Sequence, residues 1–352
     1  MVAPPWIRES GGRRIEKSTT LEDFDCILDQ AWDTYEAGNA DRALELYNRA
    51  IHRWPERAEP WYEKGLILKE TGQPEAAMDC FERVLRIDPD DYRAMVKKAD
   101  MLIWDHGEFE AGYELCREAR KRGPDLGTLA EIAHWSALAL LSLGRFDEAL
   151  KEIDQGIRKG VPSADDYSLR GEILLRKGEA KMALGSLNEA IVMDPGNGYF
   201  HYLYGCAHLY LAKEAVADRH FRRAAELDPD NYRIPCRLRS GEFDALVNRA
   251  VTALPAWVQR HLENVEISVE DLPPTEDLVD GLDFDVLGAY YGFGDPNGEE
   301  ADLPERIILF QKNIETFCGG RDELRKEIEK TVIHEVAHRF NIDDEQMPPE
   351  YR

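Results

Sequence analysis

The sequence is poor in positive charge and contains no long apolar run. Its 44 lysine and arginine residues stand against 69 aspartate and glutamate residues, which gives a formal net charge of -25. Such an acidic chain repels polyanions, so we expect neither nucleic acid nor an anionic membrane surface as a partner. Nowhere do 18 apolar residues follow one another. The chain is therefore not expected to insert into a membrane.

Cysteine motifs and a secretion signal are also missing. The six cysteines are scattered and none forms a C-x-x-C pair. This usage is typical of buried thiols in a reducing compartment and excludes a disulfide framework or a cysteine metal cluster. The first residues have no apolar core before Arg8, so secretion is not expected and the cytoplasm is the expected location. Residues 1–20, rich in Gly, Ser, Thr and charge, are expected to form a flexible arm.

What the sequence does contain is an internal repeat of about 34 residues. Prolines recur at intervals of 34, 35, 38, 33 and 34 residues, at Pro55, Pro89, Pro124, Pro162, Pro195 and Pro229. A glycine recurs between two expected helices, at Gly38, Gly72, Gly107, Gly144 and Gly178, and Ala212 takes the sixth such position. Five residues later comes a small residue, at Ala43, Ala77, Gly112, Ala149, Ala183 and Ala217. Four residues further on comes a large or apolar one, at Tyr47, Phe81, Cys116, Ile153, Leu187 and Phe221.

This pattern resembles the tetratricopeptide repeat, in six copies over about residues 25–230. Small residues let the two helices of a hairpin approach closely, and proline ends the second helix before the next hairpin begins. The resemblance implies a right-handed superhelix whose inner groove is lined by the first helix of each repeat and binds a protein or peptide. By their place in the repeat, the residues expected in this groove are Trp32, Tyr35, Tyr62, Tyr199, Tyr202 and Tyr210. Aromatic residues at helical spacing can equally belong to the core.

A different motif lies near the end of the sequence. Residues 334–338 read H-E-V-A-H, and the apolar residues that precede them recur every four positions, at Leu324, Ile328, Val332, Val336 and Phe340. The stripe predicts a helix that packs on a core, with His334 and His338 pointing away from it. Two imidazoles one turn apart can bind one zinc ion, and Glu335 between them can act on a water molecule. The alternative is an exposed pair of surface histidines.

A catalytic zinc site normally takes three protein ligands. Compared with the longer pattern H-E-x-x-H-x-x-G-x-x-H, this sequence has Asn341 at the glycine position and Asp344 at the last one. Asparagine tolerates the positive φ of such a turn, and the Asp344 carboxylate can bind zinc. Spacing ranks Asp344 first but leaves Asp343 and Glu345 open, and an acidic, solvated helix end remains the alternative.

From about residue 241 to residue 347 the chain resembles the minimal zincin-like metallopeptidases of bacteria. The segments that carry the resemblance are F-D-A-L-V-N-R-A at 243–250, N-V-E-I-S-V-E-D-L-P-P at 264–274, L-G-A-Y-Y-G at 287–292, L-P-E-R-I-I-L-F at 303–310 and the motif helix. The resemblance implies a compact α+β domain with the zinc helix packed on a small sheet. Alternation at Val265, Ile267 and Val269 and the apolar run 307–310 also predict strands.

The resemblance implies zinc held by His334, His338 and Asp344, with Glu335 as the general base. It also suggests an edge strand, either 287–292 or 306–310, along which an extended substrate lies. Tyr290, Tyr291 and Arg306 are the candidates for stabilising an oxyanion, although each can be structural.

We therefore expect a mostly α chain, with a flexible arm (1–20), six tetratricopeptide repeats (21–238) and a zincin-like domain (239–352). The function expected first is a zinc peptidase whose repeats recruit a substrate or a regulator. The alternative is an adaptor protein in which the repeats bind partners and the zincin domain is catalytically silent. A third hypothesis is a latent peptidase whose cleft the repeats shield. The substrate and the oligomeric state are left open by the sequence.

Overall fold

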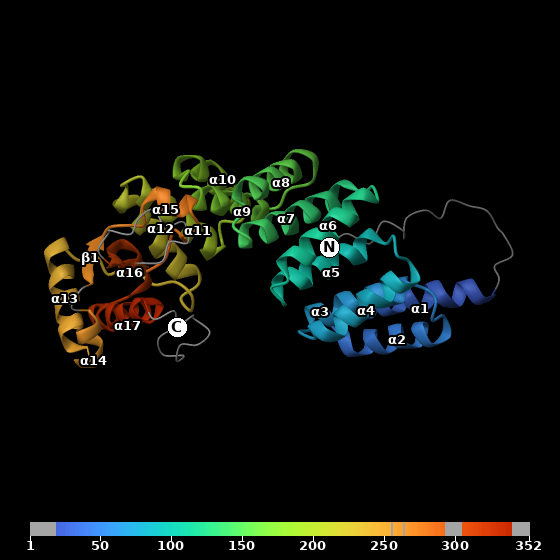
Figure 1. Ribbon diagram of the computed structural model, residues 1–352. Helices are drawn as coiled ribbons and strands as arrows, with labels where there is room; N and C mark the ends of the chain where they lie inside the picture. The colour runs from blue at the N-terminus through green and yellow to red at the C-terminus, as the bar shows by residue number, and fades with distance from the viewer. Residues whose placement is uncertain (1–18, 255, 263–264, 293–304, 340–352) are drawn as a thin grey trace. The chain divides into compact units, whose positions relative to one another are not determined.

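The computed structural model describes residues 19–254, 256–262, 265–292 and 305–339. Residues 1–128 and 129–352 form two compact units. The first unit holds three helical hairpins, made by α1 (Thr19–Glu36) and α2 (Ala40–Arg53), α3 (Glu59–Glu70) and α4 (Pro74–Ile87), and α5 (Tyr92–Trp104) and α6 (Phe109–Lys121). Helix α7 (Leu126–Ser142) begins at the limit between the units (Figure 1). None of the described helices is long and apolar enough to cross a membrane.

The second unit continues with helical hairpins and ends in a small α+β region. Its hairpin helices after α7 are α8 (Phe146–Lys159), α9 (Ala164–Arg176), α10 (Ala180–Met193), α11 (Gly198–Tyr210) and α12 (Glu214–Leu227). The α+β region contains α13 (Ser240–Ala253), α14 (Ala256–His261), β1 (Glu266–Glu270), α15 (Thr275–Val279), β2 (Gly288–Tyr291), β3 (Arg306–Phe310), α16 (Gln311–Phe317) and α17 (Arg321–Arg339). The predicted fold class, mostly α with a small α+β part at the end, is confirmed.

The repeat pattern of the sequence describes the packing of the hairpins. The small residues that follow each turn are buried, and the large residues four positions later are among the most deeply buried side chains, as for Tyr47, Phe81 and Phe221. Each inter-helix glycine has a positive φ, between 66° and 84°. Glycine is favoured here because it has no Cβ to clash in the left-handed conformation. The limits of the six repeats stay a prediction.

Ala212 occupies the glycine position of the last hairpin and is the one described non-glycine residue with a positive φ, 55°. An L-residue in this conformation is strained, so we expect Ala212→Gly to raise the free energy of unfolding by about 1 kcal/mol. Ala225→Gly, inside α12, should lower it by about 1 kcal/mol. Urea denaturation followed by circular dichroism measures the free energy of unfolding of both variants. A lower value for Ala212→Gly than for the wild type would show that Ala212 is not strained.

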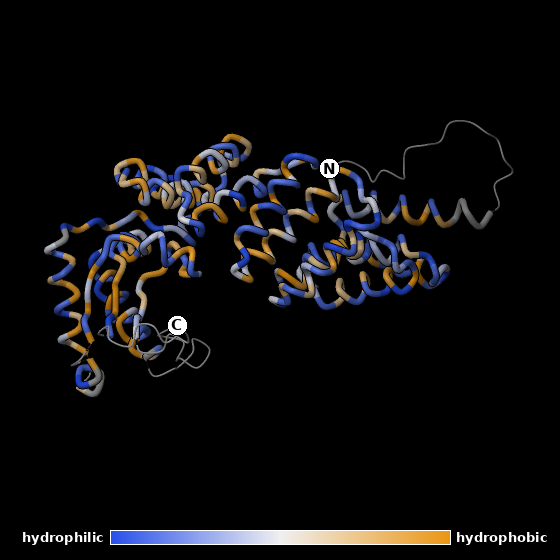
Figure 2. The backbone as a smooth tube through the Cα atoms, turned by 45° about the horizontal axis from the view of Figure 1, so that its top comes forward, coloured by the Kyte–Doolittle hydropathy of each residue, from blue (hydrophilic) through white to orange (hydrophobic). Residues whose placement is uncertain are grey.

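The α+β region is built on a three-stranded sheet in the order β1-β3-β2. Strand β3 pairs in parallel with β1 and antiparallel with β2, so β3 is central and β2 is an edge. Ile307 and Leu309 on one face of β3 join a core that contains the apolar stripe of α17, whereas Ile308 and Phe310 face the opposite side. This two-sided burial explains the continuous apolar run in the sequence. Figure 2, in which the backbone is coloured by hydropathy, shows that hydrophobic and hydrophilic residues alternate along the helices.

Contacts join the last hairpins to the α+β region within the second unit (Figure 1). Leu278 of α15 and Phe284 are buried in a cluster with side chains of α9, α11 and α12. Arg237, in the segment after α12, pairs with Asp218 at 2.8 Å and with the fully buried Glu315 at 3.4 Å. The α+β region therefore shares a core with the end of the repeat array.

Three histidines of the last hairpin lie together between α11 and α12. His201 Nδ1 and His220 Nδ1 are 3.1 Å apart, and the rings of His208 and His220 stack at 6.4 Å. Burial, the neighbouring histidines and Arg219 lower the pKa of His220 to about 4, and burial lowers the pKa values of His201 and His208. Each histidine is therefore harder to protonate in the folded chain than in the unfolded one.

We expect the free energy of unfolding to fall as the pH is lowered from 6.5 towards 4. The unfolded chain binds protons at the ordinary histidine pKa of 6.5 while folded His220 resists them, so the stabilisation is complete above 6.5 and is lost towards the folded pKa. Because His220 is partly exposed, we expect its share to be roughly 1–2 kcal/mol. Urea midpoints at pH 7 and 4.5 should differ less in His220→Asn than in the wild type. The exposed control His106→Asn should behave as wild type. If the midpoint changed equally between the two pH values in all three chains, His220 would not be the cause of the pH dependence.

Candidate metal and peptidase site

Helix α17 positions the two motif histidines on the side opposite its buried stripe. Leu324, Ile328 and Val332 are fully buried and Val336 is 3% exposed. His334 and His338 are half-buried, as the spacing predicts. The fifth residue of the predicted stripe, Phe340, lies outside the described residues. The packing of α17 on the sheet therefore fixes the direction of both imidazoles.

The imidazoles of His334 and His338 converge on one point. Their Nε2 atoms are 3.0 Å apart, and their ring centroids are 4.6 Å apart with the planes at 84°. Two ligands of a tetrahedral zinc ion, each at about 2.0–2.1 Å, are separated by roughly 3.3 Å. The observed separation is close to this value, so the pair fits zinc with small adjustments of the side chains.

Glu335 lies beside the edge strand of the sheet. Its side chain is 5% exposed. A Cβ placed on Gly288 of β2 would come within 3.4 Å of Glu335 Cγ and 2.8 Å of Thr331 Cγ2, so only a glycine lets the strand approach the helix this closely. Of the two strands considered for an extended substrate, β2 lies at the edge of the sheet formed by the described strands. The other, 306–310, is excluded because β3 is paired on both sides.

The three candidates for oxyanion stabilisation are engaged in contacts within the domain. The Tyr290 hydroxyl donates to Glu305 Oε1 at 2.8 Å, and the Tyr291 hydroxyl donates to Asp277. The Arg306 guanidinium lies 5.0 Å above the Tyr291 ring. These contacts favour structural roles for all three residues.

The predicted third ligand lies outside the described residues. This applies to Asp344, to the alternatives Asp343 and Glu345, and to Asn341 at the turn. Within residues 19–339, leaving aside the gaps, no group of three His, Cys, Asp or Glu side chains is arranged to hold a metal ion. Asp344 as a ligand stays a prediction.

The aromatic residues predicted to line the groove have different environments. In the first unit Trp32 and Tyr35 are half-buried neighbours with ring centroids 6.2 Å apart. Tyr62 is buried against Phe81, with the Arg93 guanidinium 4.8 Å above its ring. Tyr62 therefore contributes to the core, and Trp32 and Tyr35 retain exposed surface.

In the second unit, two of the predicted groove tyrosines contact the α+β region of the same chain. The Tyr202 hydroxyl donates to Asp285 Oδ2 and the Tyr210 hydroxyl to the Phe284 carbonyl, both at 3.0 Å. Tyr199 is 37% exposed and donates to Glu172 at 2.8 Å. Sequence reasoning did not single out Phe284 or Asp285, because no local pattern links position 202 to position 285.

Comparison with known families identifies both parts of the chain. A model of zincin-like metallopeptidases matches residues 262–351, and a tetratricopeptide-repeat model matches residues 28–92, 62–126 and 136–198. The chain carries tetratricopeptide repeats and a zincin-like metallopeptidase domain. Both resemblances predicted from the sequence are thus confirmed. Since the match to the zincin-like domain includes α17, the His334 and His338 pair lies in the domain expected to hold it.

Solved structures resemble the repeat part in fold. The type IV pilus biogenesis factor PilW superposes with a TM-score of 0.54 at 12% identity, over 61% of this chain and 96% of its own. PilF of Pseudomonas aeruginosa gives 0.52 at 15% identity, over 65% of this chain and 99% of its own. At these identities the likeness concerns the fold alone.

A curated relative also matches in sequence. A tetratricopeptide repeat and J domain-containing co-chaperone of Cryptococcus neoformans is 26% identical over 220 residues, which are 59% of this chain and 42% of the co-chaperone. The chain thus spans less than half the length of this relative. The zincin-like domain must accordingly be judged on its own residues.

Proposed function

We propose that this protein is a zinc-dependent peptidase whose repeats recruit a protein or peptide. One observation carries the proposal: the Nε2 atoms of His334 and His338 lie 3.0 Å apart on a helix whose buried Glu335 adjoins the edge strand β2. Two converging metal ligands, a carboxylate between them and an adjacent edge strand are parts of the equipment that peptide hydrolysis at a metal uses.

His334, His338 and Asp344 would hold the zinc ion. Zinc bound there would lower the pKa of a coordinated water and polarise a peptide carbonyl. The Glu335 carboxylate accepts a proton from the attacking water and later delivers it to the leaving nitrogen as the C–N bond breaks. An extended substrate that added as a further strand beside β2 would hold the scissile bond beside Glu335.

The repeats are of a kind that mediates protein–protein interactions. Recruitment by such an array raises the effective concentration of one polypeptide near the zincin-like domain without any new contact at the scissile bond. Because Tyr202 and Tyr210 contact the chain's own residues 284 and 285, we assign recruitment first to the half-buried pair Trp32 and Tyr35.

Metal content tests the site without needing a substrate. We expect about one zinc ion per wild-type chain by elemental analysis after excess metal is removed. His334→Ala and His338→Ala should retain almost none, because each removes one of the converging ligands. His106→Ala, at an exposed position in the first unit, is the matched control and should retain the wild-type content.

Zinc that persists in His334→Ala would show that the ion is bound elsewhere. A wild-type chain that takes up no zinc even when it is supplied would favour the adaptor alternative, in which the repeats are the working part. Either result would end the case for hydrolysis at α17.

A further inference from the structure

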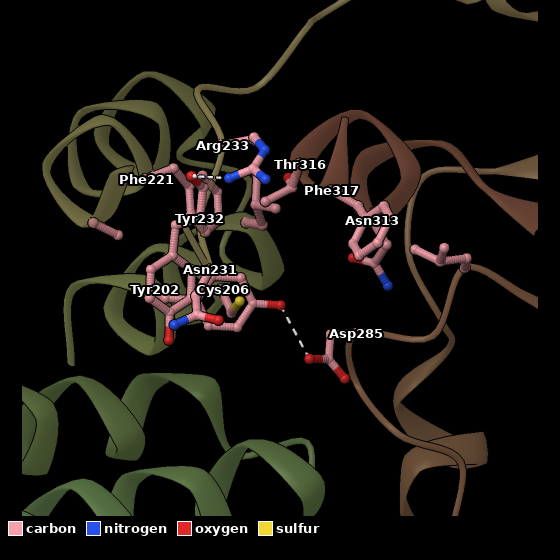
Figure 3. Close-up of a pocket in the computed structure, with 13 residues that line it drawn as sticks. Tyr202, Cys206, Phe221, Asn231, Tyr232, Arg233, Asp285, Asn313, Thr316 and Phe317 are labelled. Carbon is pink, nitrogen blue, oxygen red and sulfur yellow. Dashed lines mark hydrogen bonds between the residues drawn. The ribbon is translucent and has the colours of Figure 1, made fainter. Parts of the chain in front are cut away.

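A cavity of about 390 Å³ lies between the last hairpin and the zincin-like domain, within the second compact unit. Side chains of α11, α12, residues 231–233, the loop before β2 and α16 line it (Figure 3). Its volume is within the range of small-ligand sites, which often lie where two domains meet. None of its lining residues belongs to the H-E-x-x-H motif.

One wall of the cavity is aromatic. The rings of Tyr202 and Tyr232 stack at 5.2 Å with an interplanar angle of 28°, and Phe221 lies 5.8 Å from Tyr202. Phe317, from α16, is another lining residue and is 59% exposed. Apolar side chains of a ligand that cover this surface would make the free energy of binding more favourable.

Asp285 places a negative charge on the cavity. It is half-buried and accepts the Tyr202 hydroxyl at 3.0 Å. Among the described residues no cation lies within ion-pair distance of it, since Arg176 pairs with its neighbour Asp283 instead. A partly desolvated carboxylate beside aromatic rings is a favourable place for an ammonium group.

Arg233 supplies the opposite charge. Its guanidinium donates to backbone carbonyls, among them those of Asp230 and Tyr232 at 3.3 Å and 3.2 Å. In the described part of the chain no carboxylate forms an ion pair with it. Figure 3 shows Arg233 and Asp285 on opposite sides of the hollow. A guanidinium so placed can bind a carboxylate.

Asn313 gives the cavity a hydrogen-bond acceptor. Its Nδ2 donates to the carbonyls of Phe284 at 3.0 Å and Val286 at 2.7 Å, which fixes the orientation of the amide. Because both N–H groups of Nδ2 are used in these bonds, the Oδ1 atom of Asn313 remains to accept a peptide N–H.

We propose that this cavity binds a short peptide of two or three residues with free termini and apolar side chains. Its ammonium group pairs with Asp285, its carboxylate with Arg233, and its side chains cover Tyr202 and Tyr232. The binding itself does not require hydrolysis. The proposal rests on the proposed function only in naming the source of such peptides, which would be products of the peptidase. Leu287 lines the cavity and precedes Gly288, so the ligand would lie close to β2.

Calorimetric titration of the full-length chain with the dipeptide leucyl-phenylalanine tests the proposal, using Glu335→Gln so that no hydrolysis intervenes. We expect saturable binding that N-acetylation of the dipeptide or Asp285→Asn weakens about tenfold or more. Amidation of the carboxyl end or Arg233→Gln should weaken it similarly, and Arg233→Gln should no longer distinguish acid from amide. Arg223→Gln, an exposed arginine outside the cavity, is the control and should bind as before.

The named outcomes separate the ligand classes. If the amide binds as tightly as the acid while acetylation abolishes binding, the site takes the N-terminus of a longer polypeptide and the short-peptide proposal is wrong. Absence of binding at millimolar dipeptide, in a chain with an unaltered unfolding transition, also overturns it. Thr316→Phe, which fills the cavity from α16, should abolish binding without altering metal content. If the wild-type chain took up no zinc at the motif, the proposed function would be refuted, but the dipeptide binding result would still stand.

Discussion

Glu335→Gln is expected to slow peptide hydrolysis by about 10²- to 10⁴-fold, the usual contribution of a general acid–base group. Glutamine has nearly the same shape but cannot accept the proton of the attacking water. Because Glu335 is not one of the proposed ligands, zinc content should remain that of the wild type. Cleavage of dye-labelled unfolded casein, with new N-termini identified by mass spectrometry, measures the effect.

Asp322→Asn is the matched control for this substitution, because Asp322 is an exposed carboxylate at the start of the same helix. It should cleave casein at the wild-type rate. If Glu335→Gln retained full zinc and cleaved as fast as Asp322→Asn, the proton transfer would have to be assigned to another group. If neither the wild type nor the control cleaved casein although zinc was bound, the casein assay would have to be replaced with peptides of other sequence.

The sequence predicted those features of the site that depend on local periodicity. A four-residue apolar spacing determined which face of α17 is buried, and that face in turn directs His334 and His338 outward. The apolar run of β3 likewise follows from burial on both faces of a central strand. The recurring glycines of the sequence lie at the inter-helix turns, where the structure gives them positive φ angles.

Contacts between distant segments could not be predicted in the same way. Tyr202 and Tyr210 were placed in a peptide groove because their positions in the repeat favour the inner face. The structure brings the chain's own residues 284 and 285 against them. Helix α15 has only five residues, which is too short for periodicity to show that Leu278 is buried or against what. The cavity beside Asp285 depends on the same contacts.

These contacts give the last repeats a structural role. Phe284 and Leu278 fill the repeat core from the zincin-like side, and Asn313 and Tyr210 hold the Phe284 carbonyl from two helices. The segment so fixed leads directly into β2, the strand beside Glu335. We infer that the zincin-like domain depends on the final hairpins for the position of its edge strand.

Leu278→Ala is therefore expected to lower the free energy of unfolding of the second unit by about 2–5 kcal/mol. Leu278 is fully buried among side chains of α9 and α11, whereas its neighbour Val279 is 61% exposed. Val279→Ala is thus a control on the same short helix and should change stability by less than about 0.5 kcal/mol.

Hydrogen exchange resolved by peptide can show where the stability is lost. Because Leu278 joins two structures into one core, Leu278→Ala should speed exchange in α9 and α11 and also in β2 and α17, while α1 to α4 in the first unit keep the wild-type rates. Faster exchange in the zincin-like strands alone would mean that the repeats fold independently of them. Equal exchange in Leu278→Ala and Val279→Ala would mean that the shared core contributes little, and the zincin-like domain would then be expected to fold without the repeats.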